Sequence, residues 1–272
     1  AGASRVISFT DKMNVLTLLA CWGDPRRVVI AERSDPRHQS LGPVWEWLRR
    51  RTVPRCHAWV VQTESVARYA RTLAPQRPVV VIPNAVAPPS AAIPPPEQRR
   101  PRIVGLGRLS PEKGFDLLIQ AFARIAPWYP EWTLQILGEG PQRRALEELA
   151  DSLGVRNQVR LAGWTDRPEA ALLEAGVFAL PSRYEGFPNA LLEAMACGLP
   201  CAASDCESGP AEIIRDGVDG LLVPPEDVDA LADALRQLVS DEAKRARLGR
   251  RAAEVASRFS MATFFARWDD VV

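Results

Sequence analysis

Short apolar runs alternate with helix-like segments along the whole chain, and this alternation is the feature that most constrains the fold. Val79–Ile82, for example, is a continuous β-branched run of the kind found in strands covered on both faces. Strands that alternate with helices favour parallel sheets flanked by helices. The expected strands are Arg5–Phe9, Val28–Ala31, Ala58–Gln62, Val79–Ile82, Ile103–Leu106, Thr133–Leu137, Val159–Leu161, Val177–Leu180, Cys201–Ala203 and Leu221–Val223.

A proline-rich segment, residues 83–101, interrupts the alternation and reads as a semi-stiff linker. We therefore predict an α/β protein with two Rossmann-like, doubly wound parallel-sheet domains. The front domain would cover residues 1–86, the linker 87–101 and the second domain 102–257, while a helix at 258–272 crosses back. A Rossmann-like half usually starts with a strand and a Gly-rich turn, and neither precedes the first expected strand, so we expect the front domain to be incomplete.

The composition supports two packed cores and excludes several classes of protein. The 272 residues are 47% hydrophobic, and no apolar run approaches the ~20 residues needed to span a bilayer. No signal peptide, zinc-ribbon spacing or nucleic-acid-binding motif is found. The five cysteines are expected to be free buried thiols, as in a cytoplasmic protein.

The charge is unevenly distributed along the chain. Residues 1–95 carry 13 Lys and Arg against 6 Asp and Glu, whereas the remainder carries 21 against 27. A basic front half suggests an acidic partner, such as anionic lipid or a phosphorylated substrate. The block Trp45–Arg51 places tryptophans beside arginines, which suits a membrane interface, although two core tryptophans on a solvated helix explain it equally well.

The most informative motif runs from Glu185 to Glu193. Pro188 suits a first helical turn, so the next amides, of Asn189, Ala190 and Leu191, would lack partners and could bind an anion. Gly186 would let a ligand approach the backbone, and Glu193 lies on the same helix face as Asn189. The pattern favours phosphate at the amides and sugar hydroxyls at both glutamates, against the alternative of an ordinary helix start with a solvated glutamate.

A second motif, Gly105–Gly114, follows the first strand of the second domain. Ligands of open parallel sheets lie beyond the carboxyl ends of strands, where this loop places Arg108 and Lys113. The chain has three lysines against 31 arginines, so a lysine here hints that a compact charge is required. Two cations would neutralise a diphosphate leaving group, unless both charges are simply solvated.

Other strand ends carry weaker signals. Gly138–Pro141 is interpreted as a tight turn, and Trp164 as a contact for a base or as a core residue. The loop Glu32–His38 could face the interdomain cleft, where Glu32, Arg33 and Asp35 either touch substrate or pair with one another.

In combination these segments resemble family 4 retaining glycosyltransferases of the GT-B fold. The resemblance covers the second domain throughout and extends more weakly over the front, towards bacterial N-acetylgalactosamine-type and related hexosyl transferases. The matching segments are Gly107–Gly114, Gly138–Gly140, Pro181–Pro200, Glu212–Ile214, Asp216–Val223, Pro83–Val86, Val6–Leu16, Ser34–Pro36 and Val61–Glu64.

The resemblance implies a role for each matching residue. Arg108 and Lys113 would hold the donor diphosphate, Glu185 would contact the sugar hydroxyls and Glu193 the ribose. Gly107 and Trp164 would also lie at the donor, and backbone amides would surround its sugar and phosphate. The residues that supply those amides are Gly186, Phe187, Asn189, Ala190 and Leu191.

Retention with no protein nucleophile, no metal and no cofactor is likewise implied by the family. The histidine that many relatives carry at a front-domain strand end is not visible, and Thr10 or Asp11 stands near its place.

The predicted function is transfer of a hexosyl group from a nucleotide sugar, UDP-linked, to a glycan or lipid-linked acceptor, at the inner face of the plasma membrane and without nucleic acid. Two alternatives remain. The chain could bind a nucleotide sugar without catalysis, or it could be a UDP-sugar epimerase of the same two-domain shape.

Overall fold

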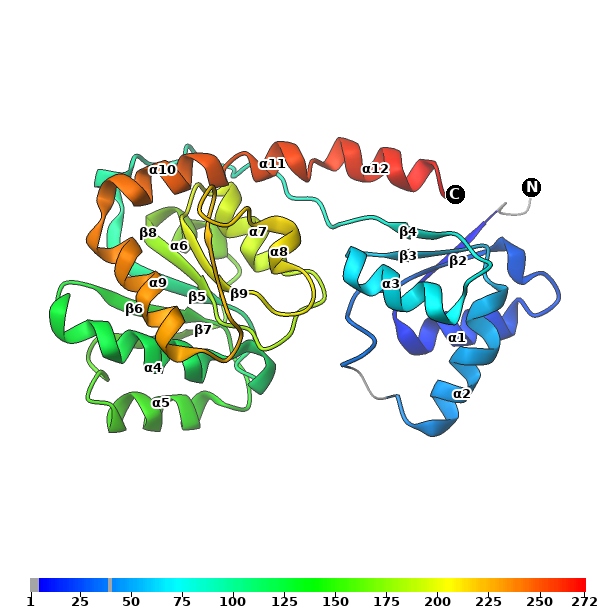
Figure 1. Ribbon diagram of the computed structural model, residues 1–272, viewed down its shortest axis with the longest axis horizontal. Helices are drawn as coiled ribbons and strands as arrows, with labels where there is room; N and C mark the ends of the chain where they lie inside the picture. Colours follow the sequence, from blue (N-terminus) through cyan, green and yellow to red (C-terminus); the bar gives the residue numbers. More distant parts are fainter. Residues whose placement is uncertain (1–4, 39–40) are drawn as a thin grey trace.

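The computed structural model describes residues 5–38 and 41–272 and contains two parallel sheets, one in each half of the chain (Figure 1). The front sheet has the order β1-β2-β3-β4, with all three pairings parallel. Its strands are β1 (Val6–Phe9), β2 (Val28–Ala31), β3 (Ala58–Val61) and β4 (Val79–Val81). Its helices are α1 (Asp11–Ala20), α2 (Pro43–Thr52) and α3 (Glu64–Leu73).

The rear sheet has the order β10-β9-β8-β5-β6-β7, and every pairing is parallel. Its strands are β5 (Arg100–Leu106), β6 (Thr133–Leu137), β7 (Val159–Gly163), β8 (Ala175–Leu180), β9 (Cys201–Ser204) and β10 (Leu221–Val223). The helices of this half are α4 (Phe115–Ile125), α5 (Arg143–Ser152), α6 (Pro168–Glu174), α7 (Asn189–Ala196), α8 (Pro210–Ile213), α9 (Val228–Ser240), α10 (Glu242–Ala252), α11 (Val255–Arg258) and α12 (Met261–Asp269). The alternation in the sequence therefore correctly predicted a doubly wound α/β fold.

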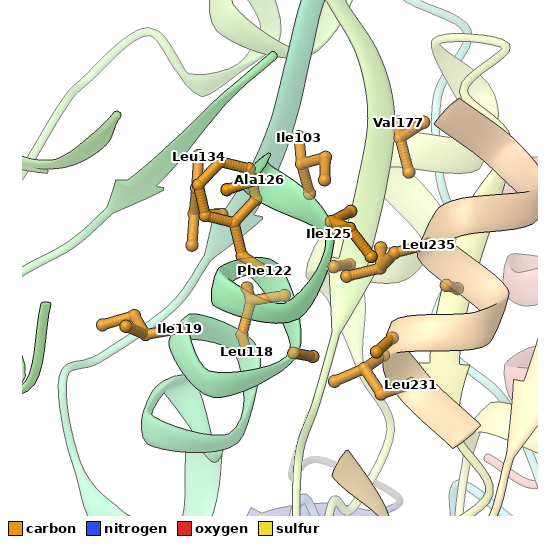
Figure 2. Packing of buried hydrophobic residues seen from close by; sticks show 14 of the residues in the cluster. Ile103, Leu118, Ile119, Phe122, Ile125, Ala126, Leu134, Val177, Leu231 and Leu235 are labelled. Carbon is orange, nitrogen blue, oxygen red and sulfur yellow. The ribbon is translucent and has the colours of Figure 1, made fainter. Parts of the chain in front are cut away.

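Both faces of the rear sheet are packed. On one face, Phe122 of α4 and Leu231 of α9 lie over Ile103 and Val177 of the central strands, as Figure 2 shows. On the other face, α7 inserts Leu191 into a second cluster that contains Phe178 and Cys201. Two covered faces explain why the central strands read as continuous apolar runs.

Strand β4 is covered on both faces, as the run Val79–Ile82 predicted. Val79 and Val81 pack against one buried cluster, whereas Val80 and Ile82 belong to a second one. The three residues of β4 are nevertheless only half-buried, because the strand lies at the sheet edge and pairs with β3 alone.

The chain crosses between the two sheets twice. The first crossing is the proline-rich segment, and the second leads from α11 into α12, which lies beside the front sheet (Figure 1). Trp268 of α12 packs with Val29, Val60 and Ile82. The backbone amide of Val86 donates to the carbonyl of Phe259 at 2.9 Å, so the two crossings are hydrogen-bonded to each other.

One smaller expectation was wrong. Strand β5 begins at Arg100 and includes Pro101, where the linker was expected to continue. Further along the chain, Glu254 separates α10 from α11 and pairs with Arg215 and Arg251.

Candidate functional site

Lys113 and Glu185 meet at the carboxyl edge of the rear sheet, 72 residues apart in the chain. Nζ of Lys113 donates to the Glu185 carboxylate oxygens Oε1 and Oε2 at 2.8 and 2.9 Å. Ser182 donates its hydroxyl to Oε1 of the same carboxylate at 2.7 Å. The Glu185 side chain is 7% exposed and that of Lys113 26%, so the ion pair is partly shielded from water but open on the lysine side.

The backbone around Gly114 positions Lys113. Gly114 has φ +64°, and a Cβ there would lie 2.1 Å from the carbonyl oxygen of Pro181. The loop that follows β5 is therefore pressed against the end of β8, which brings Lys113 to Glu185. Gly107 begins this loop, and its amide donates to the carbonyl of Leu137 at 3.0 Å.

Arg108 is exposed at the same strand end, and the part of the chain that the structure describes provides it with no ion pair. The segment Gly138–Gly140 packs against this loop, because a Cβ at Gly138 would lie 1.9 Å from the carbonyl oxygen of Gly107. Glu139 pairs with Arg143. The turn lies slightly later than expected, over Gly140–Arg143, where the amide of Arg143 donates to the carbonyl of Gly140 at 3.2 Å.

Helix α7 presents part of the expected anion site. Its first residue is Asn189, and Pro188 is the residue before it, not in the first turn as the sequence suggested. The amide of Leu191 donates to the carbonyl of Pro188 at 3.0 Å, so the prediction that it lacks a partner was wrong. No acceptor for the amides of Asn189 and Ala190 is found over residues 5–38 and 41–272, and both remain available to an anion.

Glu193 lies one turn further along α7 and lines a cavity of about 690 Å³ between the two halves of the chain. Asn189, Phe187, Arg33 and Asn84 line the same cavity. Burial raises the pKa of the Glu193 carboxyl. Its shared cavity with Asn189 agrees with the expectation that both face the same way.

Gly186 lies close to the front half of the chain. A Cβ at this position would lie 2.9 Å from Cα of Ser34 and 3.2 Å from the carbonyl oxygen of Arg33. A side chain at this position would therefore collide with the loop that follows β2. Phe187 is buried and packs against Phe259, with ring centroids 5.8 Å apart.

Trp164 is 75% exposed, so the alternative that it packs in the core was wrong. In the front half, Trp47 is 57% exposed, which overturns the core alternative for that tryptophan. Arg49 of the same block, by contrast, is buried and lies 3.8 Å from Asp11.

All five cysteines are free, and four of them are buried.

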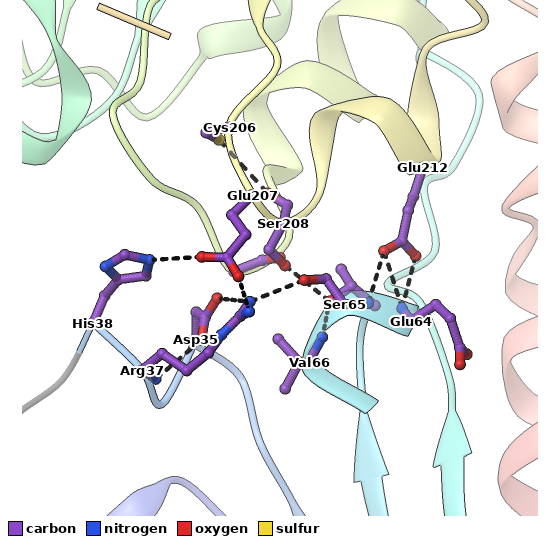
Figure 3. A network of polar contacts seen from close by, with 12 residues as sticks. Asp35, Arg37, His38, Glu64, Ser65, Val66, Cys206, Glu207, Ser208 and Glu212 are labelled. Carbon is purple, nitrogen blue, oxygen red and sulfur yellow. Dashed lines mark hydrogen bonds and ion pairs between the residues drawn. The ribbon is translucent and has the colours of Figure 1, made fainter. Parts of the chain in front are cut away.

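A polar network joins the two halves beside this site (Figure 3). Arg37 pairs with Asp35 at 2.6 Å and with Glu207 across the interface. The Glu212 carboxylate accepts from the amide of Glu64, at the start of α3, at 3.0 Å.

His38 stacks on Tyr184, the residue before Glu185, with ring centroids 4.6 Å apart. The loop Glu32–His38 thus faces the other half as predicted, and its Asp35 is engaged in a salt bridge.

Sequence reasoning missed three polar residues of the site. Ser182 orients Glu185, and Asn84 donates to Oδ1 of Asn189 at 2.6 Å. Gln62 lines the cavity of about 690 Å³ together with Asn84 and Asn189. Asn84 and Gln62 each follow a front strand, so the strand-end rule could have selected them.

Two searches over the described residues found nothing. No group of three or more His, Cys, Asp or Glu is arranged to hold a metal ion there. No helix in this part of the chain has the length and apolar character required to cross a membrane.

Residues 90–255 match the family described as glycosyl transferases group 1. The chain is 38% identical over 257 residues to an exopolysaccharide phosphotransferase of Streptomyces coelicolor, covering 91% of this chain and 26% of that protein. It is 33% identical over 171 residues to a lipopolysaccharide 1,6-galactosyltransferase of Salmonella typhimurium, covering 61% and 47% respectively.

Among solved structures, the Anabaena protein HepE in complex with UDP and glucose is similar with a TM-score of 0.85 and 22% identity, covering 97% of this chain and 76% of that one. This likeness shows the GT-B-type arrangement of two Rossmann-like domains. The chain spans from about a quarter to a half of the length of the two curated relatives described here.

Proposed function

Because the chain belongs to the glycosyl transferases group 1 family, we propose that it moves a hexosyl group from a UDP-sugar to a hydroxyl of a glycan or lipid-linked acceptor, with retention, as the family 4 enzymes that it resembles do. The observation that carries this proposal is the Lys113–Glu185 ion pair beside the open amides of α7. A cation for phosphate and a carboxylate for sugar hydroxyls stand there side by side. The proposal covers the domain limits of residues 1–86, 102–257 and 258–272 as well.

Each residue takes one part of the donor. Arg108 and Lys113 bind the diphosphate, Glu185 accepts from sugar hydroxyls and Glu193 from the ribose. Trp164 and Gly107 lie at the nucleotide. The backbone amides that surround sugar and phosphate come from Gly186, Phe187, Asn189 and Ala190, with Leu191 contributing only if its bond to Pro188 opens.

The ion pair has a specific use in this scheme. Without donor, Lys113 neutralises a carboxylate that is 7% exposed and would otherwise be costly to bury. When the diphosphate arrives, the ammonium is shared with phosphate oxygens, and a Glu185 oxygen becomes free for a sugar hydroxyl. Donor binding thus exchanges one set of charge-assisted hydrogen bonds for another.

The chemical step requires no protein nucleophile. The acceptor hydroxyl forms its bond to the anomeric carbon on the face from which the donor phosphate departs. The bond from that carbon to the phosphate oxygen breaks, and a phosphate oxygen of the leaving UDP takes the hydroxyl proton. Arg108 and Lys113 stabilise the charge that develops on the diphosphate.

The chain aligns with only 26% of the Streptomyces coelicolor protein, so the phosphotransfer in that protein's name is not proposed here. Calorimetry with UDP together with a donor-hydrolysis assay separates transfer from binding alone, since UDP binding without transfer or hydrolysis contradicts the proposed activity.

The test of the main proposal removes each partner of the ion pair. Lys113→Ala and Glu185→Ala should each lower sugar transfer at least ~100-fold, because preorganised charge at the leaving group is lost or the sugar is misplaced. Transfer is measured as UDP released with acceptor present. Lys244→Ala is the matched control, as this lysine lies on α10 and, within the described residues, its side chain donates only to Gln237. Normal transfer by either purified variant contradicts the assignment.

A membrane contact is the second part of the proposal. Exposed apolar side chains on α1 and α2 and in the loop after α1 stand beside basic ones, and cation–π pairs join several of them, such as Arg51 over Trp47 and Arg55 over Trp22. This mixture suits the surface of an anionic bilayer. We propose that the front half approaches the inner face of the plasma membrane through these elements.

A further inference from the structure

Arg33 stands at the carboxyl end of β2, directly against the loop that begins with Glu185. Its carbonyl oxygen lies 3.2 Å from the place that a Cβ on Gly186 would occupy. The front half of the chain thus delivers one arginine to the edge of the candidate site. No family resemblance assigned it a role, and sequence reasoning left open whether it pairs with its neighbours.

The Arg33 guanidinium is a half-buried cation without a carboxylate partner in the described ranges. Its Nη1 donates to Oδ1 of Asn84 at 2.7 Å, and its guanidinium carbon lies 5.0 Å from the ring centre of Phe9. These neighbours orient the side chain but do not neutralise it. Burial accordingly lowers the pKa of Arg33. Arg37, four residues on, instead pairs with Asp35 and Glu207.

The cavity of about 690 Å³ between the halves is lined by Arg33 on one side and by Asn189 and Glu193 of α7 on the other. Asn84 connects them, because it accepts from Arg33 and donates to Oδ1 of Asn189 at 2.6 Å. The cavity thus contains an unneutralised guanidinium opposite a helix start whose first two amides are open. Such a combination attracts an anion from both sides.

Carboxylates also line the cavity, and neither of the two pairs with Arg33. Glu169 accepts from the backbone amide of Ser90 at 3.0 Å and from its hydroxyl. In the proposed function, Glu193 accepts hydrogen bonds from the ribose of the donor. The positive end of the cavity is therefore the Arg33 end.

We propose that Arg33 binds a phosphate group of the substrate that fills this cavity, so that the front half supplies a third cation in addition to Arg108 and Lys113 of the rear half. The inference rests on the proposed function. The planar guanidinium can hold two phosphate oxygens at once, whereas Lys113 acts as a point charge. The phosphate belongs either to the nucleotide donor or to a phosphorylated acceptor.

The experiment compares wild type, Arg33→Gln and Arg33→Lys by isothermal calorimetry with UDP, uridine and inorganic pyrophosphate. Arg33→Gln should weaken UDP or pyrophosphate binding at least about tenfold, the equivalent of one charge-assisted hydrogen bond. Uridine, which has no phosphate, should bind all three proteins alike. Arg33→Lys keeps the positive charge but cannot hold two phosphate oxygens at once, so its loss of UDP or pyrophosphate affinity should be intermediate.

Pyrophosphate titrated into protein saturated with UDP identifies the source of the phosphate. If UDP blocks pyrophosphate, Arg33 binds the donor diphosphate. If pyrophosphate still binds and Arg33→Gln removes that binding, Arg33 binds an acceptor phosphate. Arg27→Gln is the matched control, because this front-half arginine pairs only with Asp24 in the described chain and is well exposed.

Two failures are distinguishable. Wild type that binds no UDP contradicts the proposed function itself. Wild type that binds UDP, with Arg33→Gln binding UDP and pyrophosphate equally well, overturns only the inference. A lower melting temperature of Arg33→Gln with unchanged UDP and pyrophosphate binding also overturns the inference. It would show that Arg33 stabilises the fold through its hydrogen bond to Asn84 and does not bind phosphate.

Discussion

At the scale of a single residue, Glu32 shows how burial changes the protonation state of a carboxyl group. It directly follows β2, is 3% exposed, and lies near Asp11 and Arg49, which are also buried. Burial, reinforced by the charge of Asp11 and only partly offset by Arg49, raises the pKa of Glu32 to about 8. The carboxyl is therefore neutral in the folded protein at pH 7 and ionised in the unfolded chain.

This arrangement makes stability depend on pH. The folded state holds a proton that the unfolded state loses above about pH 4.5, so the contribution of Glu32 is complete below that pH and is lost as pH rises to about 8. We expect the melting temperature of wild type to fall between pH 5 and 8. Glu32→Gln should flatten this fall, which corresponds to at most ~1.4 kcal/mol per pH unit.

Calorimetric melting at pH 5, 6, 7 and 8 measures the effect of Glu32→Gln. Glu97→Gln, which changes an exposed glutamate of the linker, serves as the control. Parallel pH profiles for wild type and Glu32→Gln would show that the buried carboxyl is not the cause.

Individual site residues were predictable to different degrees. Lys113 was selected because it follows the first strand of the second domain, and Glu185 because it precedes a predicted helix start that could bind an anion. The amide of Leu191 was assigned wrongly, since Pro188 precedes the helix and its carbonyl receives that amide. The neighbours of Gly186 and Arg33 were not predictable, because they depend on how the two halves meet, which no local pattern records.

At the scale of elements, α4 and the loop before it show how one glycine fixes a binding residue. Gly114 stands before the first residue of α4 in the left-handed conformation, with the carbonyl of Pro181 against its Cα. Lys113 precedes it directly. The position of the lysine therefore depends on a backbone contact between the loop after β5 and the end of β8.

Gly114→Ala tests that dependence. The added methyl would stand 2.1 Å from a backbone oxygen and must displace the loop. We expect a loss of at least ~2 kcal/mol in the free energy of unfolding beyond that of the control, and weaker UDP binding. Gly154→Ala is the control, since Gly154 has φ +71° with nothing within 4 Å of its Cβ position. Chemical denaturation and calorimetry provide the two measurements, and equal losses in both variants would refute the clash.

The strands were predicted to within a few residues, because each is a short apolar run with polar or turn residues at its ends. The helix start at Glu64 follows Thr63, whose hydroxyl accepts from the amide of Val66 at 3.2 Å. The edge position of β4 was not predicted, because a β-branched run has the same composition at a sheet edge as at its centre. Edge position follows from strand order, which belongs to the tertiary structure.

At the scale of the whole molecule, α1 and α2 place exposed apolar and basic side chains together. Val44 and Trp47 of α2 and Met13 of α1 are exposed, and Lys12 stands over the ring of Trp45 at 5.6 Å. Part of the basic excess of the front half lies on these two helices. The excess of basic residues was visible in the sequence. Only the fold showed that exposed apolar side chains lie on the same helices as some of these basic residues.

The membrane proposal predicts binding to vesicles that contain anionic lipid and weak binding to neutral phosphatidylcholine vesicles. Trp47→Ala should reduce sedimentation with anionic vesicles several-fold, since an interfacial tryptophan is lost. Trp128→Ala is the matched control, because Trp128 is 78% exposed but lies in the rear half. Absent binding of wild type, or equal loss in both variants, would exclude this surface as the contact.

The paired crossings between the halves govern how the molecule can move. The amide of Val86 in one crossing is bonded to the carbonyl of Phe259 in the other, and α12 anchors the second crossing on the front sheet through Trp268. Two hydrogen-bonded segments resist twisting better than a single one. We therefore expect any opening of the cavity to be a hinge motion about these crossings, which a change in the distance from Arg33 to Lys113 would report.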